Sequence, residues 1–171
     1  QKRNINMLQP IKGAVNRKFR PNSYKENDSK AKRVIIKYLK DNGHTILDTK
    51  ENYSFDITST KTGDETYFSE VEMKNQWKGD WNTNWREIRI PYRKHKLINR
   101  FKQLNKGVSY LNFYIIRGDC GAAWRIKDDV LEASEVREAD FGYRIQQGEQ
   151  FFHVPYEKAE LIYLTEGNDD P

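Results

Sequence analysis

The stretch Tyr67-Phe68-Ser69-Glu70-Val71-Glu72-Met73-Lys74 alternates polar and apolar residues in the way typical of a β-strand. Successive side chains of a strand point to opposite faces, so Glu70, Glu72 and Lys74 are expected on one face. Neighbours on that face are about 7 Å apart, and carboxylates at this spacing repel each other unless a cation offsets their charge. The stretch therefore predicts two acids and a lysine gathered in a place that suits a divalent cation.

A second β-type run, Tyr53-Ser54-Phe55-Asp56-Ile57-Thr58, comes just before, and the turn-like Lys61-Thr62-Gly63-Asp64 joins the two runs into a predicted hairpin. Directly opposed residues of an antiparallel pair share a face. Asp56 therefore joins Glu70 or Glu72 only if the numbers of paired residues add up to an even value. A three- or five-residue loop, or a bulge, meets this condition.

The charge of the chain is unevenly distributed. Residues 1–33 carry ten Lys and Arg against two acids, and residues 74–106 carry the same numbers. Residues 34–73 have four against eight, and residues 107–171 have six against thirteen. Two basic blocks thus flank an acidic centre, the pattern expected where cations hold a phosphate backbone and acids hold a metal ion. The alternative is that the lysines only solvate exposed faces.

The size and composition of the chain are typical of one folded domain. Its 171 residues, of which 36% are hydrophobic and 13% aromatic, are enough to bury a core. Long apolar runs and a signal-peptide pattern are both missing, so we expect no membrane span and a cytoplasmic location, in the host cytoplasm if the chain is viral. The single Cys120 excludes an intrachain disulfide and a cysteine-based zinc cluster.

The N-terminal part of the chain predicts a basic arm followed by a helix. Residues 1–22 have no periodicity and are expected to form the arm. The helix begins near Ser23 or near Asp28, and Gly43 ends it. An apolar stripe consists of Ala31, Val34, Ile35, Tyr38 and Leu39, and the opposite face carries Lys30, Lys32, Arg33, Lys37 and Lys40. A strand over 44–49 follows.

Residues 75–90 predict a loop, because Gly79 and several Asn and Asp residues interrupt the spacing of Trp77, Trp81 and Trp85. These tryptophans either stack on nucleic-acid bases or anchor the loop to the core. Pro91 then opens a second helix, whose buried stripe is Leu97, Ile98, Phe101 and Leu104. The residues expected to contact nucleic acid are Lys30, Trp77, Trp81, Arg89, Tyr92, Arg93, Lys94, Lys96 and Arg100.

The remaining chain predicts further strands. The apolar run over 108–117 is expected as a central strand, and the turn at 118–121 leads into a strand over 122–126. A short helix over 127–133 follows. A hairpin is expected to pair 141–145 with 150–154, and a last strand covers 159–164. The acidic balance of this segment argues against contact with DNA there.

An aspartate followed on the next strand by Glu-x-Lys, here Asp56, Glu72 and Lys74 with Glu70 two places upstream, resembles the signature of the PD-(D/E)XK nuclease superfamily. The order of elements over about residues 23–126 is similar to that of archaeal Holliday-junction resolvases and small phage-type endonucleases. The resemblance implies an α/β fold with a restriction-endonuclease-like core, α-β-β-β-α-β-β, in which helices flank a mixed central sheet. Residues 1–22 are then the basic arm, 23–126 the nuclease core, and 127–171 a C-terminal helix and β-hairpin extension of the same domain.

The sequence differs from the pattern of the superfamily at two places. Phe55 stands where many members have a proline before the aspartate. The first helix of the resolvases usually carries a metal-site glutamate, and here Glu26 and Asp28 are the nearest acids, each about one turn early.

The activity that the resemblance implies is Mg²⁺-dependent hydrolysis of DNA by an endonuclease, structure-directed or weakly sequence-directed, with Mn²⁺ as a substitute ion. Asp56 and Glu72 are the expected metal ligands, together with the backbone carbonyl of Met73, and Glu70 places a second ion or a water. Lys74 orients the attacking water. The expected partner is DNA, without a membrane or a small-molecule cofactor, and the subunit count stays open between a monomer and a homodimer. The alternatives are a DNA-binding protein that keeps the fold without cutting, and an ordinary hairpin with a charged outer face.

Overall fold

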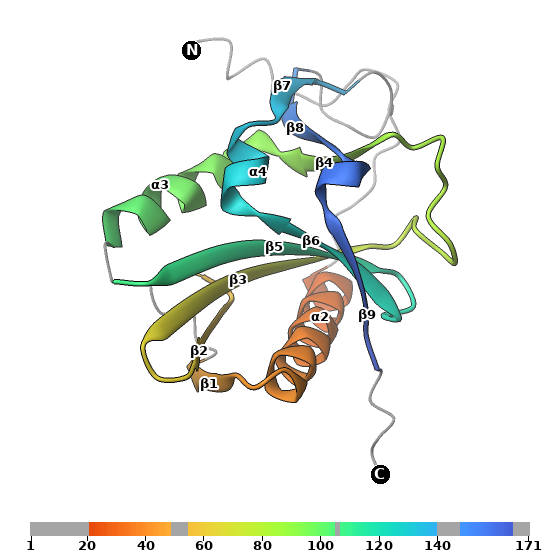
Figure 1. The fold of residues 1–171 in the computed structure, drawn as a ribbon. Helices are drawn as coiled ribbons and strands as arrows, with labels where there is room; N and C mark the ends of the chain where they lie inside the picture. Colours follow the sequence, from red (N-terminus) through yellow and green to blue (C-terminus); the bar gives the residue numbers. More distant parts are fainter. Residues whose placement is uncertain (1–20, 49–54, 105–106, 140–147, 166–171) are drawn as a thin grey trace.

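The computed structural model describes residues 21–48, 55–104, 107–139 and 148–165, with the side chains of 21–28 and of Asp48 excepted. The chain has an α/β fold with two sheets (Figure 1). The mixed six-stranded sheet has the order β1 (Thr45–Asp48), β2 (Ile57–Lys61), β3 (Glu65–Lys74), β5 (Ser109–Arg117), β6 (Ala122–Lys127) and β9 (Glu160–Tyr163). The three-stranded sheet has the order β4 (Glu87–Pro91), β8 (Gln150–Pro155) and β7 (Glu135–Glu138).

Helices cover both faces of the large sheet. The long helix α2 (Pro21–Asp41) lies on one face, and α3 (His95–Leu104), α4 (Asp128–Glu132) and the three-stranded sheet lie on the other (Figure 1). Two short 3₁₀ helices, η2 (Tyr92–Lys94) and η3 (Tyr156–Lys158), follow β4 and β8. No helix within the described ranges is long and apolar enough to cross a lipid bilayer.

Each face of the large sheet has its own hydrophobic core. On the α2 side, Ile35 and Leu39 pack with Val71 of β3 and Tyr114 of β5. On the other side, the core combines the sheet with α3, α4 and β4, and its members include Phe68, Ile88, Ile98, Phe113, Trp124 and Leu131. Because β3 alternates, Val71 lies in the first core, whereas Phe68, and with it Glu70, belongs to the face of the second.

The expected first helix is confirmed, with a different start. Ala31, Ile35 and Leu39 of the predicted stripe are buried. Gly43 ends the helix with a φ of +91°, and the N–H of His44 donates to the carbonyl of Leu39. The helix already begins at Pro21, whose missing N–H costs nothing in a first turn, rather than near Ser23 or Asp28. The side chains of Glu26 and Asp28 lie outside the described residues.

The hairpin β2–β3 has the register that the acidic cluster requires. Lys61 pairs with Glu65 across the three-residue loop 62–64, and Ile57 pairs with Ser69. Thr62 and Gly63 adopt φ values of 51° and 82° in this loop. The paired numbers add up to an even value, so extending the register by one residue puts Asp56 opposite Glu70. The geometrical condition for the cluster is therefore met with Glu70, and not with Glu72.

The predicted central strand is confirmed, since every residue of 111–116 in β5 is buried. β5 runs parallel to β3, pairing Glu70 with Phe113 and Lys74 with Arg117. A parallel pair needs a crossover, and here the crossover contains the loop 75–86, β4, η2 and α3. The chain after Lys74 is therefore brought back over the face that carries Glu70.

Two expectations about the remaining strands are wrong. The segment 75–90 was expected as a loop throughout, but Glu87–Pro91 forms β4, so Pro91 ends a strand and the helix α3 begins only at His95. The strand expected at 150–154 is present as β8, and its hairpin partner is β7 (Glu135–Glu138) where 141–145 was expected; residues 141–145 themselves lie outside the described part. Both edges of β8 are occupied, by β4 and by β7. The C-terminal strand β9 pairs with β6, so residues after 127 complete both sheets.

Candidate active site

The carboxylates of Asp56 and Glu70 are fixed by crossed hydrogen bonds at the open end of the hairpin β2–β3, away from its loop. The backbone N–H of Asp56 donates to Oε2 of Glu70 at 2.9 Å. The backbone N–H of Val71 donates to Oδ2 of Asp56 at 3.0 Å. Each carboxylate thus accepts a bond from the neighbouring strand, and this holds the two acidic groups close together with little freedom.

Glu70 is a strongly perturbed acid. Glu70 is only 6% exposed. Burial, followed by the nearby charge of Asp56, raises the pKa of the Glu70 carboxyl from 4.5 to about 8. Lys94 acts in the opposite direction, with Nζ 3.7 Å from Oε1 of Glu70. Lys32 of α2 approaches Asp56 from the other side, with Nζ 4.0 Å from Oδ1. Because the two carboxylates are close, their negative charges repel each other when both are ionised, and such cations offset this repulsion.

Glu72 and Lys74 continue the same face of β3 toward its carboxyl end. Glu72 is exposed, and its charge raises the pKa of Lys74, so the two side chains interact. Burial and, next, the charge of Arg89 lower the pKa of Lys74 more strongly, so the net shift is downward. The ammonium also lies 5.5 Å from the centre of the Trp85 ring. Lys74 is therefore a half-buried lysine whose proton is held less tightly than usual.

The expected metal ligands are only partly brought together. Asp56 and Glu70 form a close pair, whereas Glu72, expected with Asp56 as a primary ligand, lies in solvent beside Lys74. Within the described ranges, no group of three or more His, Cys, Asp and Glu side chains is placed to hold a metal ion. Because the N–H of Val71 points to Asp56, strand alternation directs the carbonyl of Met73 to the same edge of β3.

The residues present still fit a small divalent cation. Mg²⁺ takes oxygen ligands and commonly keeps several waters, so two carboxylates and one carbonyl suffice. A pair of carboxylates in which one pKa is raised by the other gains from a cation placed between them. The pair of Asp56 and Glu70 is therefore the place in the described structure where such an ion has the strongest electrostatic support.

Some of the residues expected to contact nucleic acid lie beside this pair and on the surface next to it. Lys94 touches Glu70, and Arg89 on β4 acts on Lys74. Tyr92 is 40% exposed and stacks on His95 at 5.3 Å between ring centres. The others on this side of the sheet are Arg93, which forms an ion pair with Glu149 at 3.1 Å, and the exposed Lys96 and Arg100.

The remaining expected contacts are placed differently. Lys30 is exposed on α2, which covers the opposite face of the large sheet. Trp77 is 1% exposed, stacks on Trp124 at 5.9 Å, and donates its Nε1 hydrogen to the carbonyl of Gly79 at 3.0 Å. Of the two roles considered for Trp77, stacking on bases and anchoring the loop to the core, its position matches the anchor. Trp81 is half-buried beside Trp77, and its Nε1 donates to the carbonyl of Trp85 at 2.9 Å.

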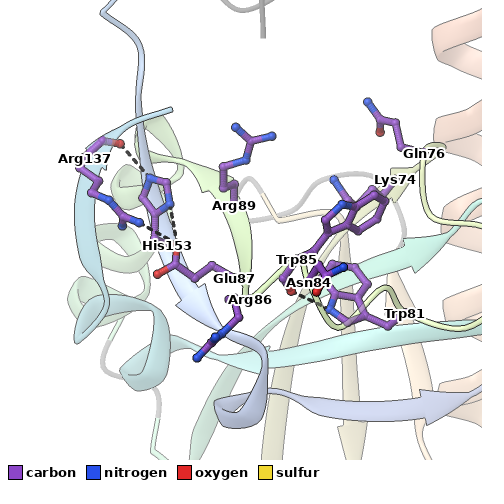
Figure 2. A pocket seen from close by; sticks show the side chains of 10 residues that line it. All are labelled: Lys74, Gln76, Trp81, Asn84, Trp85, Arg86, Glu87, Arg89, Arg137 and His153. Carbon is purple, nitrogen blue, oxygen red and sulfur yellow. Dashed lines mark hydrogen bonds and ion pairs between the residues drawn. The ribbon is translucent and has the colours of Figure 1, made fainter. Parts of the chain in front are cut away.

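A cleft of about 420 Å³ opens beside Lys74 and includes residues that the sequence analysis did not select. Its lining is shown in Figure 2: Lys74, Gln76, Trp81, Asn84, Trp85, Arg86, Glu87, Arg89, Arg137 and His153. Arg137 and His153 come from β7 and β8, in the acidic segment that was expected to be structural only. The alternation of Glu87, Ile88, Arg89 and Ile90 was the available signal that these side chains line up on a strand.

One wall of the cleft is a fixed polar network. Arg137 donates to Oε1 of Glu87 at 2.8 Å, and Nδ1 of His153 lies 3.3 Å from the same oxygen. Nε2 of His153 donates to the carbonyl of Arg137 at 3.0 Å. Because His153 is only 4% exposed and lies at the junction of β7 and β8, this network holds the three-stranded sheet in one arrangement at the cleft.

The loop that forms the other wall is held close to the large sheet. The N–H of Gly118 donates to the carbonyl of Trp77 at 3.0 Å, and a Cβ at this glycine would lie 3.2 Å from the carbonyl oxygen of Asn75. A side chain is therefore poorly accommodated where the turn after β5 meets the loop after Lys74.

No protein-family model matches the chain, and neither does any curated protein. A functional assignment consequently depends on the geometry of the acid pair, of Lys74 and of the cleft beside them.

Proposed function

We propose that the protein is a Mg²⁺-dependent DNA endonuclease. The observation that carries this proposal is the close pair of the half-buried Asp56 and the buried Glu70, with Glu70 on the face of β3 that also presents Lys74. Two carboxylates fixed side by side by backbone N–H groups form a costly arrangement, since burial and the neighbouring charge of Asp56 both disfavour the ionised form of Glu70. A functional role for that arrangement explains why it is kept.

In the proposed site, Asp56, Glu70 and the Met73 carbonyl would hold the ion. A bound Mg²⁺ would supply charge neutralisation at the scissile phosphate and a coordinated water of lowered pKa. Lys74 lies further along the same face, and in this proposal its long side chain reaches back toward the ion, orients the attacking water and stabilises the negative charge that develops on the phosphate oxygens. The lowered pKa of Lys74 makes proton transfer from it easier than from an exposed lysine. Glu72, exposed on the same face, would accept a hydrogen bond from a water bound to the ion.

The proposed fold is a restriction-endonuclease-like core. Its support is the succession α2, β1, β2, β3, α3, β5 and β6, in which the helices lie on opposite faces of the mixed sheet. The strand β4 is an addition within the crossover, and it brings Arg89 toward Lys74. The three-stranded sheet therefore adds material next to the proposed site without interrupting the core order.

DNA is the proposed substrate because of the basic side chains beside the acid pair. Lys96 and Arg100 are exposed on α3, and Lys94 at the end of η2 reaches Glu70. Residues 74–106 carry ten Lys and Arg against two acids, a density that suits a polyanion. Contacts of Lys and Arg with phosphates position the DNA backbone and carry no sequence information. This is in keeping with structure-directed or weakly sequence-directed cutting.

A second candidate is a DNA-binding protein that does not cut. The contacts of Lys94 with Glu70 and of Lys32 with Asp56 favour it, because these ammonium groups already offset the acid pair in the way a metal ion would. In that case the pair of Asp56 and Glu70 only stabilises the open end of the hairpin β2–β3, and no divalent ion is needed.

The two candidates are separated by cleavage and binding assays on the same DNA. Plasmid, branched and single-stranded DNA are incubated with Mg²⁺ and the parent protein, Asp56→Asn or Lys74→Ala. We expect the parent to cut, and both variants to lose cutting by at least about 100-fold, while Asp56→Asn keeps the DNA affinity of the parent. Lys102→Ala is the matched control, since Lys102 pairs with Glu132 on α4 at 2.7 Å and should leave cleavage unchanged. Absence of cleavage by the parent with Mg²⁺ and with Mn²⁺ favours the binding protein.

A further inference from the structure

The cleft beside Lys74 has the chemical features of a nucleotide site. Figure 2 shows the Trp85 indole and Lys74 on one side and the network of Glu87, Arg137 and His153 on the other, with Arg89 between them. Its volume of about 420 Å³ lies within the range of about 300–1,000 Å³ typical of ligand clefts. The cleft is large enough for a planar base together with a phosphate.

The charges of the lining favour an anion. Four of the ten lining side chains are Lys or Arg, and Glu87 is the only acid among them. Glu87 is engaged by Arg137 and His153 within the wall, so its charge is directed into the network and not into the open space. A phosphate entering the cleft therefore meets Lys74 and Arg89, and Glu87 is the one acid among the lining residues.

Other lining groups suit a base. Trp85 is 37% exposed, which leaves part of a large indole surface accessible. Its backbone is held by Trp81, whose Nε1 donates to the Trp85 carbonyl, and its ring packs edge-on against the Trp81 ring at 5.3 Å between centres. Gln76 and Asn84 are exposed amides at the rim, and amides can both donate to and accept from the edge of a base.

We propose that this cleft binds one unpaired nucleotide of a DNA strand, with the base on Trp85 and the phosphate on Lys74 and Arg89. The inference rests on the proposed nuclease function and narrows its substrate to DNA with an unpaired nucleotide next to the cut. Lys74 connects the cleft with the face that carries the acid pair. It lines the cleft, and its position on β3 is four residues, about 13 Å, beyond Glu70. A strand lying across this face reaches the acid pair and the cleft at once.

The test compares three DNA duplexes of the same sequence by fluorescence anisotropy in EDTA, so that no cutting occurs. One duplex is fully paired, one carries a single unpaired thymidine, and one carries an unpaired abasic nucleotide at that place. The parent should bind the thymidine bulge about tenfold or more tightly than the other two. Trp85→Ala should lose this preference, a loss of about 5- to 100-fold in affinity for the bulge, whereas Trp85→Phe should keep most of it.

Controls separate loss of the base contact from loss of the fold. Tyr163→Ala removes an aromatic side chain that is 71% exposed on β9, outside the cleft, and should leave the preference unchanged. Thermal unfolding shows whether Trp85→Ala is folded, and if it is not, Arg86→Gln, at the exposed rim of the cleft, should lower affinity for both bulged duplexes by about threefold or more. Equal affinity of the parent for the bulged and the paired duplex overturns the proposal.

Further outcomes decide the nature of the ligand. Displacement of the bulged DNA by an excess of thymidine 5′-monophosphate would reassign the cleft to a free nucleotide. A bulged RNA duplex bound as tightly as the DNA would reassign it to RNA. Both results overturn the proposal. A preference for the bulge without any cleavage refutes the nuclease and leaves the cleft assignment standing, whereas cleavage without the preference refutes the cleft alone.

Discussion

Asp56 and Glu70 are joined across two strands, with the N–H of Asp56 bonded to Oε2 of Glu70 at 2.9 Å and the N–H of Val71 bonded to Oδ2 of Asp56 at 3.0 Å. These bonds exist because a three-residue loop sets the hairpin register that puts residue 56 opposite residue 70. A change of one residue in that loop would move Asp56 to the other face of the sheet. The distance between two acids is thus determined by a turn at the far end of the hairpin.

The stability of the metal-free protein should fall as the pH rises from about 5 to about 8. Glu70 has a pKa of about 8 in the folded chain, against 4.5 ordinarily, so over this range the folded state binds a proton that the unfolded chain has released. Raising the pH removes that proton and its stabilisation. We expect a loss of about 1 kcal/mol or more in the free energy of unfolding, measured by urea denaturation in EDTA.

The variant Glu70→Gln tests whether this carboxyl is responsible. It removes the ionisable group from a site that is 6% exposed while keeping its shape and its ability to accept the Asp56 N–H. Its stability should be flatter between pH 5 and pH 8 and higher than that of the parent at pH 8. An unchanged slope in Glu70→Gln would show that other groups titrate.

Divalent cations should stabilise the parent and release protons when they bind. The ion favours the ionised form of Glu70, so at pH 7 its binding displaces the proton that the raised pKa retains. Thermal unfolding with increasing Mg²⁺ should show a rising Tm in the parent, and none in Asp56→Asn or Glu70→Gln. Calorimetric titrations in two buffers of different ionisation enthalpy measure the protons released. A Tm rise of equal size in all three proteins would place the ion elsewhere.

Lys94 should matter for the acid pair and Lys96 should not. Lys94→Met removes the ammonium 3.7 Å from Oε1 of Glu70, so the pKa of Glu70 should rise further and the stability at pH 8 should fall by about 1–2 kcal/mol. Lys96→Met, two residues along and exposed, is the matched control and should change the stability by less than about 0.5 kcal/mol. The pKa of Glu70 can be followed by NMR of its side-chain carboxyl carbon. Equal effects of the two substitutions would contradict the role given to Lys94.

Trp77 and Trp85 should differ in their effects on folding. Trp77→Ala empties a core site that is 1% exposed and should cost about 3–5 kcal/mol of stability. Trp85→Ala removes a side chain that is 37% exposed and should cost clearly less. Chemical denaturation of both variants measures the difference, and a larger loss for Trp85 would contradict the assignment of Trp77 as the core anchor.

Local patterns predicted the part of the site that lies within one hairpin. The alternation of residues 67–74 put Glu70 and Glu72 on one face, and the parity rule gave the condition under which Asp56 joins them, which the loop at 62–64 meets. The choice of Glu70 over Glu72 as the partner of Asp56 needed the actual position of the loop. A loop of three or of five residues satisfies the rule, and the residue on which it is centred decides which acid Asp56 faces.

The rest of the site depended on contacts between distant segments. β4 pairs only with β8 among the described strands, and Arg89 of β4 is opposite His153, more than sixty residues away in the sequence. The acidic composition after residue 107 suggested a structural role and hid the fact that Arg137 and His153 line the cleft. Lys94 was identified as a basic residue, but its contact with Glu70 required the crossover geometry that returns η2 over β3.

The most direct measurement of the central claim is an anomalous difference map from crystals soaked in MnCl₂. The account predicts a peak at roughly 2 Å from carboxylate oxygens of both Asp56 and Glu70, and none in crystals of Asp56→Asn. A peak bound by only one of the two carboxylates, a peak elsewhere, or no peak in the parent would contradict a shared ion at this pair.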